Sequence, residues 1–191
     1  MKVFRTQPDQ LVSIPRLIKR LPKDFSMQER MKIEERLYRI QAGFSGELKV
    51  DRYLESIGCL HSKTILTDIR LPTRSGGTFQ IDTLIISRKY ILILEVKNIK
   101  GDLYFKANPH FLLRELDGDE TRMECPITQL EVAKLNLMDW LRRNGINMEV
   151  RGEIILSNQS AFIKEIPENS PVMYMKRLTI LLQGMENLPD L

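Results

Sequence analysis

The spacing of apolar residues changes along the chain from a helical to an extended pattern. The segment SMQE at residues 26–29 matches the capping-box pattern S-x-x-E, which predicts a helix over about residues 26–41. We expect Gly43 to interrupt this helix and a second helix to cover residues 44–57. Three prolines within residues 1–25 leave room there for short helical turns only.

Extended and strongly apolar segments follow. The predicted strands are residues 64–71, 78–87, 90–98, 103–106, 111–115 and 150–157. Pro126 suits the first turn of a long helix that ends near Asn144, and residues 174–185 suit a closing helix. The order of helix, strands, helix and strand predicts an α/β fold, in which helices lie on the faces of a sheet.

Residues 78–87 and 90–98 are predicted to form a β-hairpin that is apolar on both faces and therefore central in a covered sheet. A turn centred on Arg88 and Lys89 places Asp82 opposite Glu95, and Gln80 opposite Lys97. Since strand side chains alternate between faces, these four form one polar square at the open end of the hairpin. The apolar residues expected on that face are Leu84, Ile86, Ile91 and Ile93, and those on the other are Ile81, Ile85, Leu92, Leu94 and Val96.

Opposed carboxylates repel each other, and partial burial strengthens the repulsion because solvent screens it less. A divalent cation between Asp82 and Glu95 would turn this repulsion into binding. The alternative is a solvated sheet edge at which Lys97 pairs with one acid, and a one-residue slip would put Asp82 on the face opposite Glu95. Glu47, beside an apolar helical stripe, is a candidate third acid. Gln129, near the start of the long helix, is otherwise an ordinary exposed side chain.

Composition narrows the chemistry. At 191 residues, with 42% hydrophobic and 28% charged residues, the chain suits one globular domain. It shows neither a bilayer-length apolar run nor a signal-peptide pattern, so we expect a cytoplasmic protein without membrane contact. Carboxylates and lysines must carry any catalysis, which points to Mg²⁺ or Mn²⁺. The residues that lack zinc-site spacing are Cys59, Cys125, His61 and His110.

Positive charge is concentrated near the N-terminus. Residues 1–39 hold ten Lys and Arg against five Asp and Glu, whereas the whole chain has a net charge of +4. A basic arm suits a phosphate backbone, and the alternative is a solvated helical face with i,i+4 ion pairs. The residues expected to contact nucleic acid are Arg16, Lys19, Arg20, Lys23 and Arg74.

A family resemblance is carried by four segments in order: GFSGELKVDRYL at 43–54, QIDTLII at 80–86, ILEVKNIKG at 93–101 and CPITQLEVAKLNLMDWL at 125–141. Together they resemble the nuclease-related domain, known as NERD. Asp82 followed by Glu95-Val96-Lys97 also has the D…E-x-K form of the restriction-endonuclease-like nucleases. The resemblance implies a restriction-endonuclease-like α/β core, with a central mixed sheet flanked by helices, that acts on nucleic acid. Cys125 departs from the family, in which Asn is more usual before this proline.

The resemblance also implies roles for individual residues. Asp82, Glu95, Glu47 and the backbone carbonyl of Val96 would hold Mg²⁺ or Mn²⁺. Lys97 would be the catalytic lysine. Two glutamines complete the expected site: Gln129, which matches the family's Pro-x-x-Gln helix start, and Gln80 as a supporting residue.

The expected activity is metal-dependent hydrolysis of phosphodiester bonds, in DNA rather than RNA. The alternatives are a nucleic-acid-binding module without turnover, which uses the same groove and the basic arm, and an interaction scaffold that keeps only the fold. The expected organisation is a basic helical arm (1–40), a NERD core (41–157) and a C-terminal strand and helix extension packed on the core (158–191). A homodimer is left open.

Overall fold

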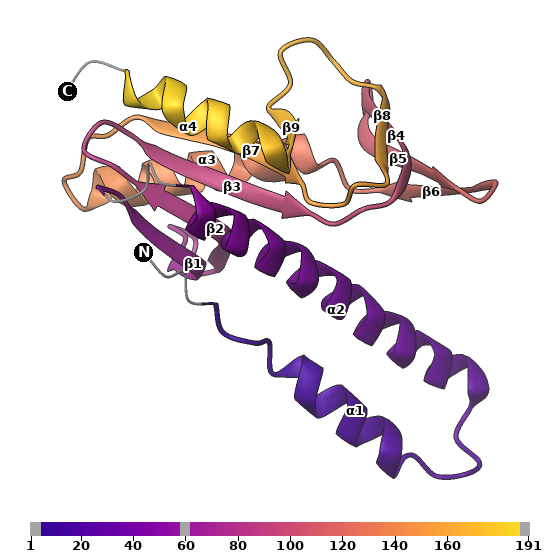
Figure 1. The fold of residues 1–191 in the computed structure, drawn as a ribbon. Helices are drawn as coiled ribbons and strands as arrows, with labels where there is room; N and C mark the ends of the chain where they lie inside the picture. The colour runs from indigo at the N-terminus through magenta and orange to yellow at the C-terminus, as the bar shows by residue number, and fades with distance from the viewer. Residues whose placement is uncertain (1–4, 58–61, 188–191) are drawn as a thin grey trace.

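A central five-stranded sheet forms the body of the molecule (Figure 1). The computed structural model describes residues 5–57 and 62–187, so Cys59 and His61 lie outside the described residues. The strand order is β1-β2-β3-β7-β9, in which β1, β2 and β3 are antiparallel neighbours and β7 and β9 add in parallel. The strands are β1 (Thr64–Pro72), β2 (Thr78–Ile86), β3 (Ile91–Lys97), β7 (Val150–Leu156) and β9 (Val172–Tyr174).

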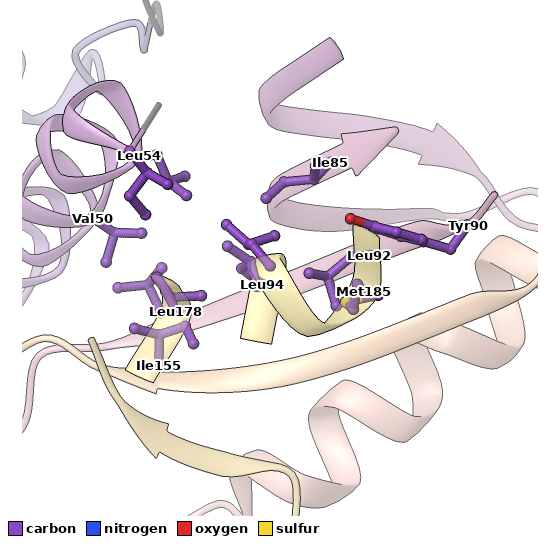
Figure 2. Packing of buried hydrophobic residues seen from close by; sticks show 12 residues of the cluster. Val50, Leu54, Ile85, Tyr90, Leu92, Leu94, Ile155, Leu178 and Met185 are labelled. Atoms are coloured by element: carbon purple, nitrogen blue, oxygen red, sulfur yellow. The ribbon is translucent and has the colours of Figure 1, made fainter. Parts of the chain in front are cut away.

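Helices cover both faces of this sheet. The C-terminal half of α2 (Met27–Ser56) and α4 (Leu178–Glu186) pack on one face, where Val50, Leu94 and Leu178 belong to one buried cluster (Figure 2). Helix α3 (Pro126–Arg143) packs on the other face, against Leu84 and Ile93 among others. The prediction of a central mixed sheet with an apolar hairpin and flanking helices is therefore confirmed, as expected for a restriction-endonuclease-like core.

A second, four-stranded sheet was not predicted as such. Its order is β6-β5-β4-β8, and its strands are β4 (Gly101–Ala107), β5 (His110–Leu116), β6 (Asp119–Met123) and β8 (Ala161–Glu165). The polar sequence DETRM of β6 is exposed along most of its length, so pairing with β5 rather than an apolar pattern makes it a strand. The predicted closing helix is replaced at its start by β9 and a short 3₁₀ turn, Met175–Arg177, before α4 begins. The division into arm, core and extension remains a prediction.

The helical arm is longer than the sequence pattern predicts. Helix α1 (Gln10–Arg20) continues through Pro15, although prolines were expected to limit this segment to short turns. Proline removes one helical hydrogen bond, and packing of α1 along α2, with Ile14 buried, compensates for that loss. The two helices extend away from the sheets as a hairpin (Figure 1). No helix within residues 5–57 and 62–187 combines the length and apolarity that crossing a membrane requires.

The expected break at Gly43 is also wrong, because α2 runs without interruption through both Gly43 and Gly46. Gly46 lies where α2 meets the ends of β3 and β7. A Cβ atom there would lie 2.5 Å from Asn98 Cβ and 2.7 Å from Ser157 Oγ. Asn98 Nδ2 also donates a 2.7 Å hydrogen bond to the carbonyl of Ala42. This close approach brings the next residue of the helix, Glu47, to the end of the hairpin.

Two glycine substitutions distinguish the effect of helix propensity from the effect of close packing between α2 and the ends of β3 and β7. We expect Gly46→Ala to lower the free energy of unfolding by about 1–3 kcal/mol, because the added methyl overlaps its neighbours. Gly43→Ala is the matched control. No atom lies within 4 Å of a Cβ added there, so it should be neutral or stabilise by up to about 1 kcal/mol. Denaturant unfolding of both variants measures this, and equal destabilisation would contradict the close-approach explanation.

Candidate active site

The predicted register of the hairpin is confirmed along its apolar part. Thr83 pairs with Leu94 and Ile86 pairs with Ile91, as a turn centred on Arg88 and Lys89 requires. The ladder ends at Thr83 and Leu94, one step before the predicted pair of acids. Beyond this point the N–H of Val96 donates to Asp82 Oδ2 at 2.9 Å. In a continued ladder the N–H of Val96 would donate to the backbone of Ile81. Here it donates to the side chain of Asp82 instead.

A kink across β1 and β2 explains why the ladder ends there. Asp68 has a φ of 50°, in the left-handed region, and the β1–β2 pairing skips the Asp68–Asp82 position. Strict alternation would put Ile81 and Leu84 on opposite faces, yet both pack against α3. The prediction that Ile81 shares a face with Ile85 is therefore wrong. The change of face falls at Asp82 and turns its carboxylate toward the backbone of β3.

Asp82 carries an unfavourable charge. Burial and the nearby charge of Glu95 raise the pKa of Asp82 to about 7, while the hydrogen bond from Val96 opposes the rise. Among the described residues, no Lys or Arg forms an ion pair with Asp82. The expected repulsion between Asp82 and Glu95 is thus present in the structure. An oxygen-seeking cation is the kind of ligand that would relieve it.

Lys97 lies beside this pair of acids. Its Nζ donates to Glu95 Oε1 at 2.7 Å and to Gln129 Oε1 at 2.8 Å. Gln129 in turn donates from Nε2 to Glu124 Oε2 at 2.7 Å, which fixes the orientation of its amide. Gln129 comes from the first turn of α3, so the long helix positions the lysine of β3. The structure therefore brings Asp82, Glu95, Lys97 and Gln129 together.

Gln80 does not take its predicted place opposite Lys97. It pairs with Arg70 of β1, and its Nε2 donates to Asp68 Oδ1 at 2.7 Å. The physical reason is the end of the β2–β3 ladder at Thr83, because Gln80 has no partner in β3 once the strands part. Gln80 and Glu47 instead help to line a groove of about 620 Å³ between the arm and β1.

Arg5 is a member of the site that sequence reasoning missed. Its guanidinium donates to Glu47 Oε2 at 2.8 Å, to Asp51 Oδ2 at 2.7 Å and to Thr83 Oγ1 at 2.8 Å. It also donates to the backbone carbonyl of Asp82 at 3.0 Å. The signal was available in Glu47 and Asp51, since two acids at i,i+4 beside an apolar stripe need a cationic partner when they are buried.

Burial and charge act in opposite directions on this ion pair. Burial raises the pKa of Glu47, and the positive charge of Arg5 opposes that rise. Burial lowers the pKa of Arg5, but its hydrogen bond to Asp51 and the surrounding carboxylates outweigh burial and raise the pKa overall. The guanidinium therefore stays charged beside these carboxylates.

Donor chemistry decides whether a divalent cation fits. Within residues 5–57 and 62–187, no three His, Cys, Asp or Glu side chains gather in a metal-binding arrangement. The site offers two carboxylates, Asp82 and Glu95, and one backbone carbonyl. Since Ser157 N–H donates to the carbonyl of Lys97, strand alternation directs the carbonyl of Val96 to the opposite side, toward β2 and Asp82. Three hard oxygen donors suit Mg²⁺ or Mn²⁺, which retain several waters.

The basic residues expected to contact nucleic acid are all exposed. Arg16, Lys19 and Arg20 lie on α1, and Lys23 lies in the turn that follows it. Arg74 lies apart from them in sequence, in the turn between β1 and β2. The structure thus leaves these charges free to meet a ligand.

Comparison with known families agrees with this arrangement. The model of the nuclease-related domain family, NERD, matches residues 42–157, which is more than half of the chain. The chain belongs to the NERD family. No curated protein matches it. The NERD match begins just before Gly43 and ends at Ser157, so it includes Glu47, Asp82, Glu95, Lys97 and Gln129. Arg5 and α1 lie outside it.

The raised pKa of Asp82 predicts how stability depends on pH. A carboxyl with a folded-state pKa of about 7 against an ordinary value of 3.8 costs stability as pH rises between these values, and the cost is complete above 7. Without divalent metal, Asp82→Asn should therefore unfold at a higher temperature than wild type at pH 8. Because Asn also accepts a weaker hydrogen bond from Val96 than a carboxylate does, we expect a gap of roughly 3–6 °C, equivalent to about 1–2 kcal/mol rather than the full cost of the pKa shift.

The gap between Asp82→Asn and wild type should narrow as pH falls toward 4, where both side chains are neutral. Glu131→Gln, at an exposed position of α3, removes one acid away from the site and should show no such pH-dependent gap. Thermal unfolding in chelator measures both variants. If Asp82→Asn is less stable than wild type at pH 8, the proposed destabilisation by the charge of Asp82 is contradicted.

Proposed function

We propose that this NERD protein is a metal-dependent nuclease that hydrolyses phosphodiester bonds, in DNA rather than RNA. The observation that carries the proposal is the partly buried Asp82 carboxylate, opposed by Glu95 and lacking an ion pair among the described residues. A cation bound between these two acids would stabilise the pair at neutral pH, and Lys97 lies within hydrogen-bond distance of Glu95. Membership of a nuclease-related family supports the same chemistry.

Asp82, Glu95 and the carbonyl of Val96 would hold Mg²⁺ or Mn²⁺. Bound there, the ion would neutralise charge on the phosphate and lower the pKa of a coordinated water. The partly buried carboxylates orient this binding, since the Val96 N–H fixes one oxygen of Asp82 and leaves the other available.

Lys97 is proposed to position the attacking water and to stabilise charge on the phosphate. Its ammonium group donates hydrogen bonds to Glu95 and Gln129, a geometry that suits a charged donor better than a base, which would have to lose a proton. Its ion pair with Glu95 and its hydrogen bond to Gln129 orient the ammonium group. Gln129 is therefore a positioning residue, held in turn by Glu124.

Cleavage assays test this assignment. Wild-type protein with Mn²⁺ or Mg²⁺ should cut at least one of single-stranded, duplex, flapped or branched DNA, and chelator should abolish cutting. Asp82→Asn and Lys97→Met should each lower the rate by about 100-fold or more, because both remove charge from the reacting centre. Gln129→Ala should cost about 10-fold, as is usual for residues that orient a catalytic group.

Glu131→Gln serves as the charge-matched control for Asp82→Asn and should cleave like wild type. An RNA panel run in parallel tests the preference for DNA. If wild type cuts no substrate with either metal, or if Asp82→Asn cuts as fast as wild type, the nuclease proposal fails.

The exposed basic arm favours a second candidate, a nucleic-acid-binding module without turnover. In either case the arm should bind the phosphate backbone, so a variant with four Gln substitutions should bind DNA more weakly at low salt. The salt dependence of its binding should also fall by about one power of salt concentration for each phosphate that the variant no longer neutralises. The substituted residues are Arg16, Lys19, Arg20 and Lys23.

A control variant should neutralise an equal number of exposed basic residues outside the arm and should bind like wild type. Its positions are Arg88, Arg142, Lys176 and Arg177. Fluorescence anisotropy in chelator measures binding separately from cleavage. Equal weakening in both variants would show that net charge, rather than the arm, determines affinity.

A further inference from the structure

The buried guanidinium of Arg5 forms five hydrogen bonds to two different elements of the site. Its side chain is only 2% exposed, and each nitrogen of the guanidinium donates to an oxygen of the site. Three of these oxygens belong to acids of α2, one of Glu47 and both of Asp51, and two belong to β2, the carbonyl of Asp82 and the hydroxyl of Thr83. A single cationic group therefore joins the helix to the kinked strand that presents the candidate metal ligand.

The contact with the Asp82 carbonyl follows from the kink in the sheet. The β1–β2 pairing skips the Asp68–Asp82 position, so β1 does not form a regular pair with Asp82 there. Arg5 Nη2 donates to that carbonyl at 3.0 Å. The guanidinium thus completes the backbone bonding at the point where the sheet changes face.

The position of Arg5 limits what Glu47 can bind. Glu47 Oε2 is held at 2.8 Å by a group that is also bonded to the Asp82 backbone. A cation shared between Glu47 and this part of β2 would have to occupy the volume of the guanidinium. Glu47 is 23% exposed at the groove wall, so a small ion could reach it if Arg5 were removed.

Charge balance gives the same limit independently. Asp82 and Glu95 at the end of the hairpin and Glu47 and Asp51 on α2 give four carboxylates, and Arg5 and Lys97 give two positive charges. Asp68 and Arg70, which line the same groove as Glu47, add one charge of each sign, so the fully ionised group has two negative charges in excess, which a single divalent cation neutralises. A second divalent ion beside Arg5 would leave an excess of positive charge in a partly buried site, which is unfavourable.

We propose that the Arg5 guanidinium takes the place of a metal ion beside Glu47 and Asp51. The chain then binds a single divalent cation, at Asp82 and Glu95, and Glu47 binds none while Arg5 is in place. The location of that single ion rests on the proposed function, whereas the displacement of a cation by Arg5 does not. Arg5 is a positioning residue for Asp82, and it lies outside the segment that the NERD model matches.

Counting the Mn²⁺ ions bound to the 191-residue chain tests this proposal without measuring activity. Electron paramagnetic resonance of free Mn²⁺ during titration gives the number of ions bound per chain. Wild type should bind one ion. Arg5→Met should bind two, the second about 10-fold or more weakly because Glu47, rather than a pair of acids, would hold it. The double variant Arg5→Met with Glu47→Gln should return to one.

Arg16→Met is the matched control, since it removes an exposed arginine of the same arm and should leave one ion bound. Removing Arg5 leaves Glu47 and Asp51 unpaired, so circular dichroism must show that the variant is folded. If it is not folded, Arg5→Met with Asp51→Asn removes one of these charges, keeps Glu47 free and should bind two ions.

The outcomes separate this inference from the proposed function. Two ions on wild type, or one ion on the folded Arg5 variants, would overturn the role of Arg5 and leave a metal-dependent nuclease intact. No ion on wild type would overturn the metal site at Asp82 and Glu95. In that case one ion on Arg5→Met that disappears with Glu47→Gln would still support Arg5, and none would overturn it.

Discussion

Repulsion among carboxylates at the open end of an apolar hairpin is the constraint on which the rest of the site depends. Asp82 and Glu95 are brought together by a register that buried side chains fix on both faces of β2 and β3, so the strands that carry them cannot separate without breaking the core. Two cationic side chains from distant parts of the chain, Arg5 and Lys97, pair with the neighbouring acids. Lys97 contacts Glu95 along the same strand, and Arg5 contacts Glu47 and Asp51 from the N-terminal arm. Neither Lys97 nor Arg5 forms an ion pair with Asp82. The raised pKa of Asp82 reflects its burial and the remaining repulsion from Glu95.

Backbone geometry decides which acid is left over. A left-handed residue in β1 and a change of face in β2 coincide at the level of Asp82, and together they turn its carboxylate to the N–H of Val96. The same change leaves the Asp82 carbonyl to Arg5 and directs the carbonyl of Val96 to the same side. On the opposite wall, the absence of a side chain at Gly46 lets α2 approach β3 and β7 closely enough for Glu47 to reach this point. The site is therefore assembled at a break in the sheet. Hydrogen bonds to side chains satisfy the backbone groups at this break, and Gly46 lets α2 pack close to it.

Local chemistry explains how much of this could be predicted. Apolar alternation fixed the hairpin, its register and the acids at its end, because each depends on neighbours close in sequence. The long helix α3 was predicted for the same reason, with Pro126 at its start. The failures at Ile81 and Gln80 both come from the kink, since a periodic pattern cannot reveal one residue that breaks the period. Arg5 was missed because its partners lie more than forty positions away along the chain, and only the need of Glu47 and Asp51 for a cation pointed to it. The unbroken path of α2 through Gly43 reflects tertiary packing that outweighs helix propensity.

The cost of the site to stability distinguishes a ligand-binding role from a scaffold. A fold kept only as an interaction surface would be more stable with a neutral side chain at position 82, because asparagine could still accept the hydrogen bond of Val96 without repelling Glu95. Marginal stability makes such a cost of about 1–2 kcal/mol substantial for a domain of this size. A binding partner that carries positive charge returns that energy when it occupies the site, and a divalent ion does so with the least volume. Strain at Asp82 and the proposed affinity for a cation would be two results of the same repulsion, which is why we propose a ligand-binding role rather than a purely structural one.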